Sequence, residues 1–277
     1  ARDRVQGRPV GMSKEDAKNS TIIDHADVRR MLMTMKSYSD AMRYMMYDSQ
    51  MMLDLSYFAE DELKDFGEER CGLLTPIGKS WISDLSVELT STAIQVYGGM
   101  GYVEETGIAQ YFRDARIAPI YAGTNGIQAL DLLFRKIPLD GGNAISKLFG
   151  EMQSTVSEIE KLENFNHLSN TLKFHINELK NVTESITGLL IDGELADASG
   201  SATPFLKMFG QVLGGHYMGK ALVKAHEKFT ESNDEFYKDK ITLSKFYLEQ
   251  LLPLASGYID AIKSGNEDLF KIKSNNF

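Results

Sequence analysis

The feature that most constrains this chain is a long run of apolar residues at helical spacing, with no strand-like alternation of useful length anywhere. Between residues 22 and 58, apolar side chains recur every three or four positions, which is typical of one face of an amphipathic helix. These positions are Val28, Met31, Leu32, Met35, Tyr38, Met42, Met45, Met46 and Leu53. The methionine stripe suits either a pliable ligand surface or a core, and we expect a core.

Two further helices are expected in the first half of the chain, with a break before each. Residues 60–76 are charged and end in Thr-Pro, which predicts a connector. The next helix is expected to end at Gly98-Gly99, because paired glycines are common helix stops. Glycines interrupt residues 98–126, which we predict to be irregular. A third helix is expected to begin at Thr124 or Asn125, either of which can cap it, and to end at Ile137.

The second half of the chain is predicted to be a separate helical unit. The segment "PLDGGN", residues 138–143, is the clearest linker. Helical periodicity with few interruptions follows over residues 144–162, 165–190, 203–230 and 234–264. The fold class is therefore predicted to be all-α, with a helical bundle over residues 1–137 and a second all-helical domain over residues 139–277.

Composition excludes several classes of partner. The net charge of −9 argues against a general nucleic-acid surface or an anionic-membrane surface. No run approaches the ~18 apolar residues of a membrane span. The single cysteine, Cys71, excludes an intrachain disulfide and fits a reducing compartment, so we expect a cytoplasmic location. The five histidines show no spacing typical of a metal site, and we expect no metal.

The opening segment "ARDRVQGRPVG" has no initiator methionine and reads like the tail of a helix. We therefore expect this chain to be a piece of a longer polypeptide, with further domains upstream.

Glycine-rich motifs carry the functional signal. In "QVYGGMGYVEETG", residues 95–107, a helix ends in Gly-Gly-x-Gly, which lets bare backbone approach a pyrophosphate or a flavin edge. Taken alone, such glycines are more often structural. The succession "ARDRVQGR", "AIQVYGGMGYVEETG" and "YFRDARIAPIYAGTNGIQALDLL" is more specific, because it closely resembles the C-terminal helical domain of the acyl-CoA dehydrogenases over residues 1–137.

The rest of the chain fits the same family. Residues 139–277 resemble the extra helical domain of its larger members. The sequence segments "HADVRRML" and "GTNGIQALDLL" are most similar to those of the 3-methylmercaptopropionyl-CoA dehydrogenase subgroup. The resemblance implies α,β-dehydrogenation of an acyl-CoA, with FAD bound between the subunits of a homodimer or larger homo-oligomer. It also implies an electron acceptor such as electron-transfer flavoprotein.

The resemblance assigns residues to the cofactor and the substrate. It implies that Arg4 contacts the flavin pyrophosphate, although Gly7 replaces the phenylalanine usual near it. The other expected cofactor contacts are Gln95, Val96, Gly98, Gly99, Thr124, Asn125 and Gly126, and the expected substrate contacts are Tyr121 and Gly123. From the residues alone, Asn125 could instead be only a helix cap.

Ala122 stands where many family members have the glutamate that removes the substrate α-proton. Its amide can still donate a hydrogen bond to the thioester oxygen, but its methyl group cannot accept a proton. Three explanations are open: a substitution that blocks turnover, a base supplied by a helix upstream, or a naturally base-less subunit of a heteromer. Glu104 and Glu105 are expected to be solvated, and Arg113 and Asp114 to form an ion pair that holds residues 117–126.

Two functions from different classes therefore compete. The chain is either the C-terminal portion of an FAD-dependent acyl-CoA dehydrogenase, inactive without its upstream domains, or a helical scaffold for oligomer assembly. The repeated glycines between residues 98 and 126 favour the enzyme. Each glycine lowers stability because it loses more conformational entropy on folding than other residues do, and a purely structural scaffold would gain nothing from them.

Overall fold

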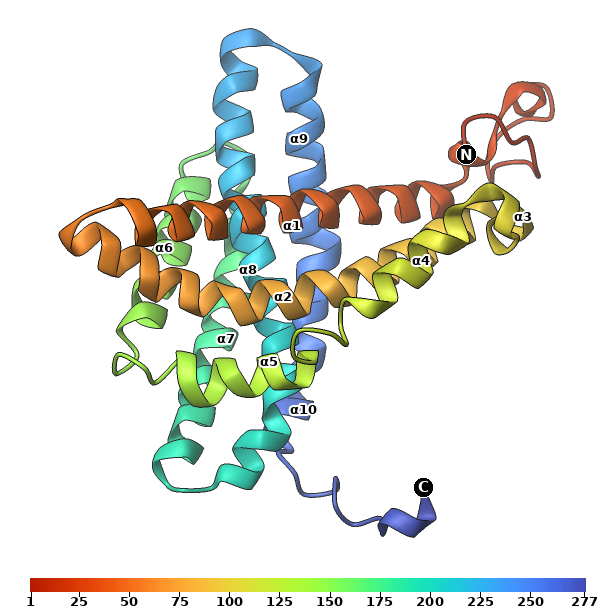
Figure 1. Cartoon of the computed structure of the whole chain (residues 1–277). Coiled ribbons are helices and arrows are strands. Elements are labelled where there is room, and N and C mark those ends of the chain that lie inside the picture. The colour runs from red at the N-terminus through yellow and green to blue at the C-terminus, as the bar shows by residue number, and fades with distance from the viewer.

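The computed structural model describes residues 1–277 and contains only helices, turns and loops, which confirms the all-α prediction (Figure 1). The first two long helices lie side by side and run in opposite directions. Shorter helices then return along the second of them. The helices of this part are α1 (Ala26–Phe58), α2 (Asp61–Tyr97), α3 (Gly99–Tyr102), α4 (Ile108–Ile117) and α5 (Asn125–Asp131), which continues as a π-helical turn over Leu132–Lys136.

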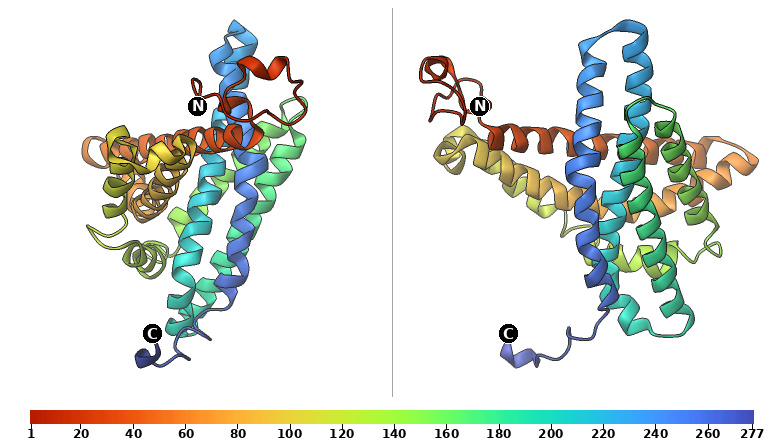
Figure 2. Two further views of the ribbon diagram at one scale, coloured as in Figure 1. Left: turned by 90° about the vertical axis from the view of Figure 1, so that its right-hand side faces the viewer. Right: turned by 180° about the vertical axis from the view of Figure 1, so that it is seen from behind.

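The second part of the chain is a bundle that crosses the first. Its helices are α6 (Asn143–Glu160), α7 (Asn166–Ile191), α8 (Leu195–Ser232), α9 (Glu235–Phe246) and α10 (Ile259–Lys263). Irregular helical turns over Tyr247–Leu251 and Leu252–Tyr258 join α9 to α10. Figures 1 and 2 show α7, α8 and α9 running across the direction of α1 and α2, which form a layer on one side. No helix is both long enough and apolar enough to cross a membrane.

The long first helix is confirmed, but the predicted connector over residues 60–76 is wrong. That segment is the first half of α2, and Pro76 lies inside the helix. An interior proline costs about 3 kcal/mol. Leu73, Leu74 and Ile77 are completely or almost completely buried, and burying each such side chain contributes about 1.5–3 kcal/mol. Tertiary packing therefore outweighs the local signal that predicted a break.

The prediction of an irregular stretch over residues 98–126 is also wrong in part. Residues 108–117 contain no glycine and form α4, which begins after Gly107 in the left-handed conformation. The helix expected near residue 124 is confirmed. Thr124 is its N-cap, and the Thr124 hydroxyl accepts a hydrogen bond from the Ile127 amide at 3.4 Å.

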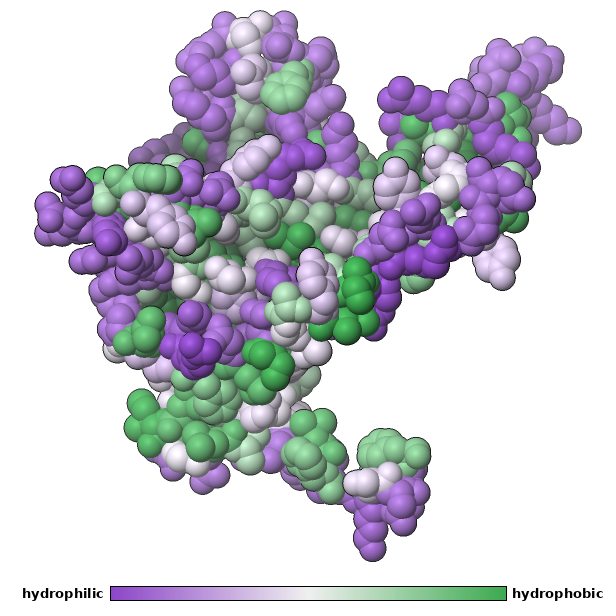
Figure 3. Space-filling model, in the orientation of Figure 1, coloured by the Kyte–Doolittle hydropathy of each residue, from purple (hydrophilic) through white to green (hydrophobic).

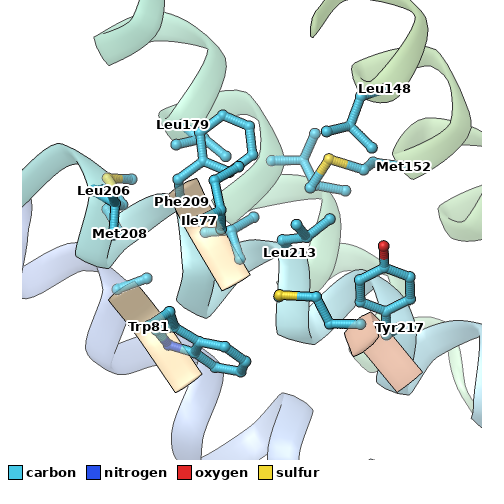
Figure 4. Packing of buried hydrophobic residues seen from close by; sticks show 14 of the residues in the cluster. Ile77, Trp81, Leu148, Met152, Leu179, Leu206, Met208, Phe209, Leu213 and Tyr217 are labelled. Atoms are coloured by element: carbon cyan, nitrogen blue, oxygen red, sulfur yellow. The ribbon is translucent and has the colours of Figure 1, made fainter. Parts of the chain in front are cut away.

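One hydrophobic core joins the two parts. A single cluster of 43 buried residues draws on α1, α2, α5 and all the bundle helices. Figure 4 shows Ile77 and Trp81 of α2 among the side chains of α8. A β-carbon added at Gly210 or Gly214 would overlap the Trp81 indole, so both glycines let α8 approach α2 closely. The domain boundary at residues 137–139 stays a prediction, since both units share this core.

Buried polar contacts tie the same two layers together. Arg70 on α2 is 3% exposed and forms a two-pronged ion pair with Glu151 on α6, with Nη1 and Oε2 3.0 Å apart. Lys240 on α9 pairs with Asp40 on α1 at 2.7 Å. Such pairs stabilise one arrangement of the layers because an unpaired buried charge is costly.

Substituting Gly210→Ala is expected to lower the free energy of unfolding by about 1–3 kcal/mol, because the added methyl group has no room beside Trp81. Gly150→Ala is the matched control, since no neighbouring atom lies within 4 Å of an added β-carbon there, inside α6. The control should be neutral or stabilising by up to about 1 kcal/mol. Urea unfolding measures both, and equal stability of the two variants would contradict a close Trp81 contact.

The free energy of unfolding is expected to fall as the pH is lowered, because His216 is buried. Burial lowers the pKa of His216 to about 3, and its Nδ1 lies 3.1 Å from the Thr155 hydroxyl. In the unfolded chain, His216 has the ordinary histidine pKa of about 6.5. The stabilisation that comes from keeping His216 neutral in the folded protein is therefore complete above about pH 6.5, and it falls by about 1.4 kcal/mol for each pH unit below that value.

His216→Gln should therefore make the decline in unfolding free energy between about pH 6.5 and pH 4.5 shallower, whatever it does to stability at neutral pH. His167→Gln is the control, because His167 is 56% exposed. If His216→Gln leaves the slope unchanged, His216 is not held neutral in the folded protein.

Candidate functional site

The residues between α4 and α5 form a tight exposed turn, residues 119–124, which we call the 122 turn. Two successive residues have left-handed backbone there, with φ of 55° at Ala122 and 81° at Gly123. Glycine tolerates this conformation, but for alanine it costs about 1–2 kcal/mol. Strain held on an exposed surface points to a functional role for the turn.

Three successive backbone N–H groups on the 122 turn are free. The amides of Ala122, Gly123 and Thr124 donate to no acceptor within the chain. Their neighbours are satisfied: the Tyr121 amide donates to the Ile117 carbonyl at 3.2 Å, and the Asn125 amide to the Pro119 carbonyl at 3.1 Å. Adjacent free donors at a fixed turn suit a ligand oxygen that carries or develops negative charge.

Asn125 anchors the turn to α2. Its side-chain amide nitrogen lies 3.2 Å from the Ser80 carbonyl, 3.0 Å from the Ser83 hydroxyl and 2.7 Å from Asp84 Oδ1. The alternative that Asn125 only caps a helix is therefore wrong, because Thr124 is the cap and Asn125 is the anchor. A role for Asn125 beside a cofactor stays a prediction.

Lys79 completes the anchor and was missed from the sequence. Its Nζ donates to the Gly123 carbonyl and to Asn125 Oδ1, the latter at 3.0 Å. Partial burial lowers the pKa of Lys79, and the nearby Asp84 acts in the opposite direction. The available signal was the group of polar residues Lys79, Ser80, Ser83 and Asp84, whose helical spacing places them on one side of α2.

The expected role of Arg113 is corrected. Arg113 does not form an ion pair with Asp114, but donates from both terminal nitrogens to Glu104 at 2.8 and 2.9 Å. Glu104 is consequently paired, although both side chains are largely exposed. The pair links the short 3-10 turn over Glu104–Thr106 to α4. The 122 turn is held by Lys79 and Asn125 instead.

The second group of expected site residues lies at the C-terminal end of α2. Gln95 and Val96 are in its last turn, and Gly98 follows with φ of 65°. Nothing lies within 4 Å of an added β-carbon at Gly98 or Gly99, so the bare backbone faces open space. Such backbone can be approached closely by a planar or phosphate-bearing group.

The structure does not bring these two groups of residues into one pocket. The ten residues of α4 lie between them, a helix length of about 15 Å. Arg4 lies in the segment before α1, where it is exposed and its carbonyl accepts a hydrogen bond from the Ile22 amide at 2.8 Å. Its contact with a pyrophosphate stays a prediction.

Apolar side chains surround the 122 turn. The exposed members are Ile117, Ile120, Tyr121 and Ile127. Figure 3 shows hydrophobic residues gathered on the surface near the start of α5. An exposed apolar patch of this kind indicates a surface that is covered by a ligand or a protein partner. No group of three or more His, Cys, Asp or Glu side chains is placed to hold a metal ion.

Two protein families match successive parts of the chain. The family model described as "Acyl-CoA dehydrogenase, C-terminal domain" matches residues 11–136. The model described as "Acetyl-CoA dehydrogenase C-terminal like" matches residues 148–273.

Curated relatives match most of the chain. The chain is 33% identical over 260 residues to 3-methylmercaptopropionyl-CoA dehydrogenase of Ruegeria pomeroyi, covering 91% of this chain and 43% of that protein. It is 26% identical over 284 residues to the broad-specificity linear acyl-CoA dehydrogenase FadE5 of Mycobacterium tuberculosis, covering 98% of this chain and 46% of that protein. The chain thus spans less than half the length of these relatives.

Solved structures share the fold. Caenorhabditis elegans ACDH-11, solved in complex with C11-CoA, matches with a TM-score of 0.61 and 20% identity over 88% of this chain and 40% of that one. A Bacillus anthracis acyl-CoA dehydrogenase complexed with FAD matches with a TM-score of 0.61 and 16% identity, and the match covers 92% of this chain and 48% of that one. The two family matches and the 33% identity to the Ruegeria enzyme show that the chain belongs to the acyl-CoA dehydrogenase family, whose C-terminal helical domains it matches.

Proposed function

We propose that this chain is the C-terminal helical portion of an FAD-dependent acyl-CoA dehydrogenase, which forms a double bond between Cα and Cβ of an acyl-CoA thioester. The observation that carries the proposal is the run of three free N–H groups on the 122 turn. When the α-proton leaves, the thioester oxygen gains negative charge, and fixed N–H donors at that oxygen stabilise it.

The side chains around the 122 turn suggest where the acyl chain lies. Ala122 would donate its amide to the thioester oxygen, with Tyr121 and Gly123 on either side of it. Ile117 and Ile120, both exposed, would line the path of an apolar acyl group. Similarity to the Ruegeria enzyme favours a short thioether-bearing substrate such as 3-methylmercaptopropionyl-CoA.

The residues present fit FAD. Gly98 and Gly99 offer open, bare backbone at the end of α2, as close approach of a nucleotide requires. Gln95 and Val96 would line the adenosine end, Arg4 would contact the pyrophosphate, and the segment from Thr124 to Gly126 would run beside the cofactor. When bound, FAD supplies the acceptor for the hydride that leaves Cβ.

The distance between the two groups of residues supports a shared site between subunits. Because α4 separates Gly98 from the 122 turn, one chain can contribute these regions to two different cofactors. We therefore infer a homodimer or larger homo-oligomer, in which upstream domains of the same protein complete each site. Electron-transfer flavoprotein is the proposed electron acceptor.

The proton acceptor is missing at position 122. An alanine methyl group cannot take the α-proton, whereas the amide donors and the bare backbone at Gly98 do not depend on that side chain. We propose that position 122 is where the base belongs, and that this chain supports binding of acyl-CoA without its turnover.

Ala122→Glu in the full-length protein is expected to raise the rate of flavin reduction by acyl-CoA by about 10²–10⁴-fold, the usual contribution of a positioned general base. Anaerobic stopped-flow absorbance measures this rate. Ala122→Gln is the control, because it matches glutamate in size but does not accept a proton at neutral pH. Equal rates for the two variants would place the base elsewhere, for example on an upstream helix.

A further inference from the structure

Lys79 fixes the direction of one peptide group in the 122 turn. The Gly123 carbonyl and the Thr124 N–H belong to the same planar, trans peptide unit, so they point in opposite directions. Lys79 Nζ holds that carbonyl against α2. The Thr124 N–H must therefore point away from α2, where it meets no acceptor of the chain.

The turn needs such a restraint because of its backbone. The 123–124 peptide rotates through ψ of Gly123 and φ of Thr124, and Gly123 has no β-carbon to restrict its ψ. Thr124, at φ of −61°, resists the rotation from the other side because its β-branched side chain disfavours positive φ, and the Lys79 hydrogen bond adds to that restraint. Rotation of the 123–124 peptide would turn the Thr124 N–H towards α2 and the Gly123 carbonyl outwards. A carbonyl oxygen on that surface would repel a substrate oxygen. The neighbouring peptide is held more weakly, by Gln128 Nε2 at 3.4 Å from the Ala122 carbonyl.

Lys79 is itself held on a rigid platform. Its Nζ is shared with Asn125 Oδ1 at 3.0 Å, and Asn125 also bonds to Asp84 at 2.7 Å. Trp81, two residues beyond Lys79, is 4% exposed and fills the space over the α8 glycines. The lysine therefore starts from a helix segment whose position is fixed by the core.

We propose that Lys79 is a positioning residue for thioester recognition, which keeps the 123–124 peptide oriented so that the Thr124 N–H joins the Ala122 N–H as a donor to the substrate. This inference rests on the proposed function of the 122 turn. It assigns to Lys79 a role in binding the acyl group, beyond its contact with Asn125 beside the proposed cofactor segment.

The test uses the full-length protein with its flavin, in variants Lys79→Met and Lys79→Arg. Titration with a short acyl-CoA, followed by the flavin absorbance, gives the dissociation constant. In protein that carries its flavin, Lys79→Met should weaken acyl-CoA binding about tenfold, which is a change of about 1.4 kcal/mol. Lys79→Arg keeps a cationic donor and should restore most of the affinity. Lys147→Met is the matched control, because it removes an ion pair 3.1 Å long to Glu69 and should leave acyl-CoA binding unaltered.

A vibrational readout separates positioning from general stability. The carbonyl stretch of a ¹³C-labelled thioester should shift to lower frequency in the unsubstituted protein, and less in Lys79→Met. An unchanged shift together with unchanged affinity in Lys79→Met would overturn the inference and leave the proposed function standing. Failure of the unsubstituted protein to bind any acyl-CoA would instead overturn the proposed function itself. If Lys79→Met loses its flavin, a full carbonyl shift in Lys79→Arg supports the inference, and loss of the shift there contradicts it.

Discussion

The close contact of Trp81 with Gly210 and Gly214 fixes how the two layers of this fold meet. A residue larger than glycine at either position would overlap the indole ring. Tyr38 packs edge-on against Trp81 with ring centroids 6.1 Å apart, and Tyr247 packs against Tyr38 at 5.6 Å. Four segments of the chain therefore meet at one aromatic cluster, and the relative position of α2 and α8 has little freedom.

The middle of α2 serves both the core and the candidate site. Ile77, Trp81 and Leu85 are buried against the bundle. Lys79 and Asp84, on another side of the same segment, hold Asn125 and the 122 turn. Core packing and the geometry of the turn are consequently linked through this stretch of α2.

The sequence predicted those features that depend on local patterns. The apolar spacing of α1, the stop at Gly98 and the cap at Thr124 are each set by a few neighbouring residues, and the structure confirms them. Pro76 was misjudged because the burial that outweighs its cost comes from the bundle. The charged residues after position 60 also suggested a loop, although they lie in the exposed first turns of α2.

The polar contacts between distant helices could not be predicted from local sequence patterns. Lys79 and Gly123 are 44 residues apart, and Arg70 and Glu151 are 81 apart. Nothing in the spacing of either pair predicts a contact, because each depends on how separate helices pack. The resemblance to a known family located position 122, but it did not reveal which side chains hold the turn in place.

The most direct test of this account is an absorbance spectrum of the full-length protein that carries this sequence, recorded before and after anaerobic addition of a short acyl-CoA. We expect a bound flavin whose bands shift on mixing without bleaching, because the turn binds the thioester and Ala122 cannot remove a proton. Prompt bleaching would contradict the assignment of the base to position 122. Absence of flavin would contradict the enzyme assignment and favour a scaffold.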